Sequence, residues 1–111
     1  MINIDVIRDK SRAIIGFEIK GHACFDISGK DIVCAAVSAI AYTALGGLKN
    51  VAEIEFHYTE QEGKFECCLI STDDFEKKNK ASVIMETTFI GFKQIEKAYS
   101  KNVRVVDKEV Q

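Results

Sequence analysis

The sequence predicts a single α+β domain in which two helices pack on an antiparallel sheet of four to five strands. Four segments alternate apolar and polar residues as strands do, and they group into two hairpins. A long apolar helix separates the hairpins and an amphipathic helix follows the second, which gives the order β-β-α-β-β-α with an optional final strand. No proline, repeat or low-complexity segment marks a boundary, so we predict one domain over residues 1–111.

The first hairpin lies at the start of the chain. Ile2, Ile4 and Val6 alternate with polar residues, which is the period of a half-buried strand. A polar turn follows at residues 9–12, and residues 13–20 again carry strand-forming side chains. Because the connection is short, we expect the two strands to pair antiparallel.

A loop at residues 21–29 leads into the first helix. Ser28 and Asp31 fit the Ser-x-x-Asp pattern that caps a helix start, although Asp31 also fits as the capping residue itself. We expect the helix to end at Gly46 and Gly47, since glycine readily adopts the left-handed conformation of a helix C-cap. The few polar side chains of this helix recur about one turn apart and form a narrow stripe: Cys34, Ser38 and Tyr42.

The second hairpin is predicted between the two helices. Residues 52–59 alternate apolar and polar side chains, residues 60–63 form a turn that contains a glycine, and residues 64–71 form the fourth strand. The adjacent Cys67 and Cys68 must then point to opposite faces of the sheet.

The second helix is predicted from about residue 74 to residue 101, and residues 103–106 would add a short edge strand. One face of this helix carries apolar side chains at helical spacing, which should pack on the sheet: Met85, Phe89, Phe92, Ile95 and Tyr99.

Charge and composition exclude several function classes. A formal net charge of -2 gives no reason to expect nucleic acid as the main ligand, because phosphate binding needs a concentrated basic surface. Residues 1–10 lack the apolar centre of a secretory signal, and residues 32–48 are slightly short for a membrane span and better explained as a buried helix. We therefore expect a cytoplasmic protein with reduced cysteines and no membrane partner.

Cys34 and His22 are the first candidates for chemistry. A cysteine near a helix N-terminus feels unpaired backbone N–H groups and the positive end of the helix dipole, and both favour the thiolate. His22 lies in a loop flanked by glycines and would act as the base if that loop folds back over the helix start. The alternative is that Cys34 packs as a small buried side chain.

Other residues near this pair have roles that the sequence leaves open. Asp31 either caps the helix or orients His22 as the third member of a triad, and Ser38 either supports the site or bonds its own helix backbone. His22, Cys24 and Cys34 are also zinc-ligand types, but no Cys-x-x-Cys pair accompanies them. A redox pair of Cys24 and Cys34 lacks that spacing as well. We therefore expect no metal and no cofactor.

Two stretches carry a family resemblance, GHA at residues 21–23 and GKDIVCAAVS at residues 29–38. They resemble motifs of the ribosomal-processing cysteine protease family, Prp, and the similarity in element order and length covers essentially the whole chain. The resemblance implies that His22 and Cys34 are the catalytic pair of an endopeptidase. It also implies a homodimer and a ribosomal protein precursor as substrate: an N-terminal extension of large-subunit ribosomal protein number twenty-seven, cut after paired phenylalanines.

In the mechanism that this implies, His22 takes the Cys34 proton, the thiolate attacks the peptide carbonyl, and the imidazolium protonates the leaving amine. N–H groups at the start of the first helix would stabilise the oxyanion, and the loop at residues 21–29 would order over Cys34 when substrate binds. The alternative function is a non-catalytic, ribosome-associated binding module. It would have an unreactive thiol and would keep its function in a Cys34→Ala variant.

Overall fold

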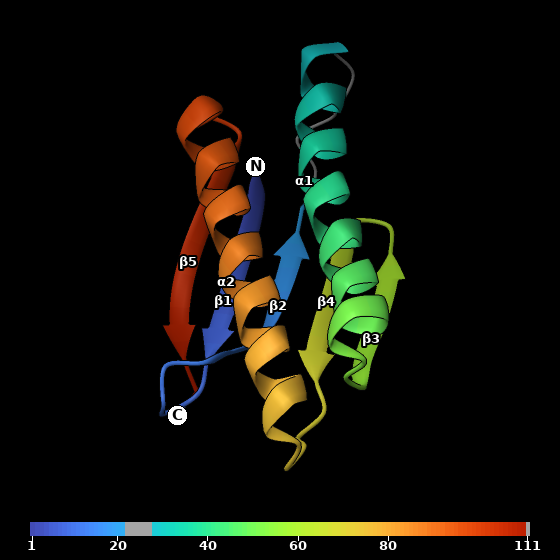
Figure 1. Cartoon of the computed structure of the whole chain (residues 1–111). Coiled ribbons are helices and arrows are strands. Elements are labelled where there is room, and N and C mark those ends of the chain that lie inside the picture. The colour runs from blue at the N-terminus through green and yellow to red at the C-terminus, as the bar shows by residue number, and fades with distance from the viewer. Residues whose placement is uncertain (22–27, 111) are drawn as a thin grey trace.

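The computed structural model describes the backbone of residues 1–21 and 28–110, and the side chains of residues 1–21 and 32–110. Figure 1 shows two helices lying on one face of a five-stranded sheet. The predicted α+β class and element order are confirmed. In chain order the elements are β1 (Ile2–Arg8), β2 (Ile14–Lys20), α1 (Ser28–Gly47), a π-helical turn (Leu48–Ala52), β3 (Phe56–Gln61), β4 (Lys64–Leu69), α2 (Phe75–Ala98) and β5 (Val103–Glu109).

The sheet is mixed, with the strand order β3-β4-β2-β1-β5. β1 pairs with β2, β2 with β4 and β4 with β3, all antiparallel, as predicted. The optional fifth strand is present, but it runs parallel to β1, with Ile2 opposite Val103. α2 carries the chain from β4 back along the sheet to its far edge, and a crossover helix of this kind returns the chain in the parallel direction. The prediction of an antiparallel sheet therefore holds for four strands and not for the fifth.

The core lies between the sheet and the two helices. Alternate residues of β1 are buried there, as the sequence period predicts: Ile2, Ile4 and Val6. Phe92 of α2 is 0% exposed. Its ring meets that of Phe17 on β2 edge-on, with 5.5 Å between the ring centroids. This contact joins α2 to the middle of the sheet.

α1 and the turn after it form a very apolar stretch. By length and composition alone, Ile32–Ala52 is able to cross a membrane, a test that the core helix of a globular domain also passes. Val33 and Val37 on its inner side are buried in the core, as expected for the predicted buried helix. Its outer side is exposed, with Ile32 and Tyr42 at the surface, so burial is confined to one side.

α1 ends at Gly47, as predicted, but the backbone conformation there differs from the prediction. Gly47 has right-handed helical backbone angles and the chain continues into the π-helical turn, so the glycine pair does not form a left-handed cap. Glu53 adopts the left-handed conformation instead, with φ of 53°, and its N–H donates to the carbonyl of Leu48. Leu48 and Ala52 are both buried, and their burial keeps the chain helical beyond the glycines. β3 therefore begins at Phe56, later than predicted.

Gly47 and Gly91 have a packing role between the helices. A Cβ atom on Gly47 would lie 3.3 Å from the side chain of Ile84 on α2, and one on Gly91 would lie 3.3 Å from that of Ile40 on α1. The missing side chains therefore let α1 and α2 approach closely.

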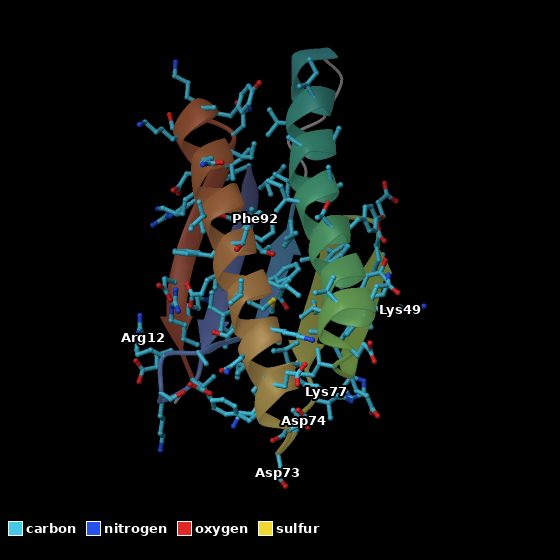
Figure 2. All side chains as sticks on the ribbon, in the orientation of Figure 1. Arg12, Lys49, Asp73, Asp74, Lys77 and Phe92 are labelled. Atoms are coloured by element: carbon cyan, nitrogen blue, oxygen red, sulfur yellow. The ribbon has the colours of Figure 1, made fainter. Side chains whose placement is uncertain are left out.

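α2 starts where the sequence predicts. The side chain of Asp74 accepts a hydrogen bond of 3.1 Å from the backbone N–H of Lys77, and both residues lie at the beginning of the helix (Figure 2). Met85 and Phe92 of the predicted apolar face are buried, whereas Tyr99, at the helix end, is exposed.

A buried arginine ties β1 to α2 and β5. Arg8 Nη1 donates to Glu86 Oε2 at 2.6 Å, and Arg8 Nε donates to Asp107 Oδ1 at 2.9 Å. The guanidinium also lies 5.3 Å from the ring centroid of Phe89. The hydrogen bonds to Glu86 and Asp107 raise the pKa of Arg8, so burial does not remove its charge. The last strand is thereby held to the first by ion pairs as well as by backbone bonds.

Candidate active site

Figure 1 shows the turn that joins β3 to β4 beside the middle of α1, and a groove lies between this turn and the helix. Its volume is about 440 Å³, within the range of small-molecule and peptide side-chain sites. One wall comes from α1 and the other from the hairpin, while the ends of β1 and β2 close the base. The groove is lined by Ile2, Ile19, Gly21, Cys34, Val37, Ser38, Glu60, Gln61, Glu62, Gly63, Lys64 and Phe65.

Cys34 lies in the second turn of α1 and borders this groove. Its side chain is partly buried and packs against the edge of the core. The field of the helix dipole is strongest in the first turn. α1 begins at Ser28, so the thiol lies beyond that turn. Access to the groove, more than the helix start, therefore distinguishes this position.

Ser38 lies one turn further along α1, is exposed, and lines the same groove. Tyr42, another turn on, reaches the hairpin, as its hydrogen bonds to β3 show. The predicted polar stripe is confirmed, because all three side chains face the hairpin side of the helix.

Several predicted site residues lie outside the described part of the structure. His22 and Cys24 fall in residues 22–27, and Asp31 belongs to α1 by its backbone but its side chain is not described. The pairing of His22 with Cys34 and the role of Asp31 stay predictions, and the zinc and redox alternatives stay untested. Gly21, to which His22 is covalently linked, does line the groove, and its N–H donates to the carbonyl of Gly63 at 2.9 Å.

Sequence reasoning missed a cluster of side chains at the groove wall, which we call the Glu60 cluster: Tyr42, Tyr58, Glu60 and Phe65. The hydroxyl of Tyr42 donates to the two carboxylate oxygens of Glu60 at 2.7 and 2.5 Å, and the hydroxyl of Tyr58 donates to the same carboxylate. The ring centroid of Phe65 lies 5.6 Å from that of Tyr42 and 5.1 Å from that of Tyr58. The cluster joins α1 to the hairpin through side chains.

These hydrogen bonds change the acid–base behaviour of the Glu60 cluster. They lower the pKa of Glu60, because both hydroxyls stabilise its carboxylate. The bond to Glu60 raises the pKa of Tyr58 to about 12 and also raises the pKa of Tyr42. The cluster is therefore intact, with Glu60 charged and both phenols protonated, across the neutral range.

The other described cysteines and the second histidine lie away from the groove. Cys67 is buried in the core, and burial raises the pKa of its thiol to about 12, whereas Cys68 is exposed on the opposite face. The predicted opposite orientation of the two is confirmed. His57 is exposed on β3 and does not line the groove. Among the described cysteines, Cys34 alone borders it.

Comparisons with known proteins agree with one another. The sequence model of the cysteine protease Prp family matches residues 1–104. The ribosomal processing cysteine protease Prp of Bacillus subtilis is 32% identical over 107 residues, which are 95% of this chain and 96% of that protein. The corresponding protein of Staphylococcus aureus is 25% identical over 107 residues, which are 95% of this chain and 97% of that protein.

Solved structures share the fold. The crystal structure of an essential ribosomal processing protease Prp from S. aureus, in complex with a substrate peptide, matches with a TM-score of 0.84 and 22% identity, over 97% of this chain and 100% of that one. The structure of SMU.848 from Streptococcus mutans matches with a TM-score of 0.82 and 24% identity, over 99% of this chain and 96% of that one.

Proposed function

The chain belongs to the cysteine protease Prp family and is a cysteine peptidase, and from that premise we propose what it cuts and how. The substrate is the precursor of large-subunit ribosomal protein number twenty-seven. The enzyme removes its N-terminal extension by one cut after paired phenylalanines, in the cytoplasm, as a step of ribosome maturation. The observation that carries the proposal is the position of Cys34 at the border of a groove large enough for a peptide side chain.

Cys34 is the nucleophile and His22 is the general base and acid. His22 takes the thiol proton, the sulfur bonds to the scissile carbonyl carbon, and the imidazolium returns the proton to the leaving amine as the C–N bond breaks. Water then hydrolyses the thioester, which releases the new carboxylate and the thiol. Two observations support this choice: Cys34 borders the groove while Cys67 and Cys68 do not, and His22 directly follows a groove residue while His57 lies elsewhere.

Asp31 and Ser38 support the pair. Asp31 holds the imidazole or fixes the helix start beside it, and Ser38 places a hydroxyl one turn from Cys34. The first N–H groups of α1, from Ser28 onward, lack intrahelical partners and can donate to the oxyanion. One such donor is worth about 2.7–4 kcal/mol in other enzymes.

The apolar part of the groove fits an aromatic substrate side chain. Ile19, Val37 and Phe65 line it from β2, α1 and β4. Burial of an aromatic ring against such side chains is favourable, and ring–ring contact with Phe65 would add to it. This lining supports a recognition sequence that contains phenylalanine.

The enzyme acts as a homodimer in this proposal, through the outer face of its two helices. Val83 and Ile90 on α2 are 67% and 55% exposed, and a shallow apolar furrow between α1 and α2 lies beside them. Residues 32–48 contain no charged side chain that would oppose a second copy. Ile90→Glu should therefore shift sedimentation from dimer to monomer, whereas Phe75→Glu, at another exposed apolar residue, should leave the dimer in place.

The test of the protease proposal is mass spectrometry of a synthetic peptide that spans an extension with paired phenylalanines. The wild type should cut once, after the second phenylalanine. Cys34→Ala and His22→Ala should abolish the cut, while the matched controls Cys68→Ala and His57→Ala should keep it. An intact peptide with folded wild-type protein would favour the non-catalytic binding module, and cutting by Cys34→Ala would assign the nucleophile elsewhere.

A further inference from the structure

The wall of the groove opposite Cys34 is held to β2 by backbone pairing and to α1 by side chains. Tyr42 lies on α1, two turns beyond Cys34, and its hydroxyl bonds Glu60 on β3. The hydroxyl of Tyr58, on the same strand, bonds the same carboxylate. Glu60 itself lines the groove. The helix that carries Cys34 is thereby tied to the hairpin that faces it.

Phe65 connects the Glu60 cluster with the apolar part of the groove. Its ring lines the groove and lies between three other rings: those of Tyr42 and Tyr58, and that of Phe17 in the core at 5.9 Å between centroids. Phe65 is part of β4, which is paired with β2, so any change in the separation of α1 and the hairpin would change the distance between Phe65 and α1. The position of the hairpin therefore sets the shape of the groove.

We propose that the Glu60 cluster is a positioning device that fixes the β3–β4 hairpin against α1, and so sets the width of the groove in which a substrate side chain binds beside Cys34. The substrate part of this inference rests on the proposed function, whereas the fixing of the hairpin does not. Tyr42 and Glu60 act through Phe65 and the hairpin, so they are positioning residues. Their loss should weaken substrate binding and leave the chemical step nearly unchanged.

The strength of the tie comes from charge. Two neutral hydroxyls donate to one carboxylate, and hydrogen bonds to an ionised acceptor are shorter and stronger than neutral ones. Removal of one hydroxyl leaves the other bond in place, but only the Tyr42 bond crosses from α1 to the hairpin. Tyr42→Phe is therefore the sharpest single change, since it keeps the ring contact with Phe65 and deletes the link.

Two readouts test the proposal. The first is hydrogen exchange of the backbone amides of residues 60–65, which reports the hairpin directly and needs no substrate. The second is steady-state cleavage of the phenylalanine-pair peptide, which separates KM from kcat. Tyr99→Phe is the matched control, because it removes a tyrosine hydroxyl outside the Glu60 cluster. Glu60→Ala removes the acceptor, while Glu60→Gln keeps an acceptor oxygen without the charge.

Tyr42→Phe and Glu60→Ala should speed exchange in the hairpin and raise KM by about three- to tenfold, with kcat within about twofold of wild type. Glu60→Gln should fall between Glu60→Ala and the wild type, and Tyr99→Phe should match the wild type. Hydrogen exchange in Tyr42→Phe equal to that of the wild type would overturn the proposal. Faster exchange would also overturn it if KM were unchanged, or if the variant lowered kcat and left KM as in the wild type. If the wild type cuts no peptide, the proposed function fails while hydrogen exchange still decides whether the cluster holds the hairpin.

Discussion

Cys67 and Cys68 are neighbours in β4 but lie on opposite faces of the sheet, one 2% exposed in the core and the other at the surface. Burial removes water from the Cys67 thiol, which disfavours its thiolate and raises its pKa to about 12. The alternation of a β-strand thus gives two adjacent cysteines different chemistry.

Iodoacetamide at neutral pH should therefore modify Cys68 and spare Cys67, because only the thiolate of an accessible cysteine reacts at a useful rate. Fragment mass spectrometry of the peptide that contains both residues distinguishes the two sites. Cys67 should react once urea unfolds the chain. Equal labelling of both in the folded protein would contradict the burial of Cys67.

Phe92→Ala should lower the free energy of unfolding by about 3–5 kcal/mol, because it leaves a cavity between α2 and β2 where the ring packs on Phe17. Urea denaturation followed by circular dichroism measures the change. Phe75→Ala is the matched control, since the ring of Phe75 is 75% exposed and its loss should cost less than about 0.5 kcal/mol. Similar losses in both variants would place Phe92 outside the core.

Much of this fold follows from local sequence signals. The alternation of Ile2, Ile4 and Val6 predicts β1 correctly, and the apolar spacing predicts α2 with its start near residue 74. The direction of β5 could not be read in the same way, since it depends on which edge of the sheet α2 reaches. The prediction that α1 ends at Gly47 is confirmed, but the predicted left-handed cap is wrong, and the close approach to Ile84 explains this glycine instead.

In the candidate site, too, local sequence signals predict some residues and miss others. Cys34 and Ser38 could be predicted together because one helical turn separates them, and both do line the groove. The bond between Tyr42 and Glu60 joins α1 to β3, so no local spacing indicates it. The predicted turn at residues 60–63 also concealed Glu60, which the structure assigns to the end of β3.

Tyr58 should lose its phenol proton only at high pH. The pKa of Tyr58 is raised from 10.0 to about 12 by its bond to Glu60, so the protonated phenol is favoured in the folded state. This contribution to stability is complete below pH 10 and is lost as the pH rises toward about 12. Ultraviolet titration of tyrosinate in the wild type, minus that of Tyr58→Phe, should isolate the late step. An ordinary midpoint near 10 in the difference curve would contradict the bond.

Acid should weaken the Glu60 cluster by protonating Glu60. The two hydroxyls lower the pKa of Glu60 from 4.5, so its contribution is present above that pH and is lost as the pH falls through the lowered value. The slope of unfolding free energy against pH below 4.5 should be smaller in Glu60→Gln than in the wild type. Parallel curves for the two proteins would show that Glu60 titrates normally.

Two glycine substitutions should change the stability of the protein in opposite directions. Gly16→Ala would place a Cβ 2.6 Å from the backbone oxygen of Cys67, across the β2–β4 pairing, and should destabilise the protein by about 1–3 kcal/mol. Gly46→Ala meets no atom within 4 Å and lies in α1, where alanine is favoured by about 0.5–1 kcal/mol. Thermal unfolding of both variants checks the prediction, and a stabilised Gly16→Ala variant would refute the close approach of β2 and β4.

The pairing of β5 with β1 has a consequence for the synthesis of the chain. β1 leaves the ribosome first, yet its outer edge gains a neighbour only after Val103–Glu109 has been made and Arg8 has met Asp107. Until then the nascent protein carries an open strand edge, which is a template for pairing with other chains. Completion of this fold therefore waits for its last strand, and the protease acquires its final form only after β5 has left the ribosome.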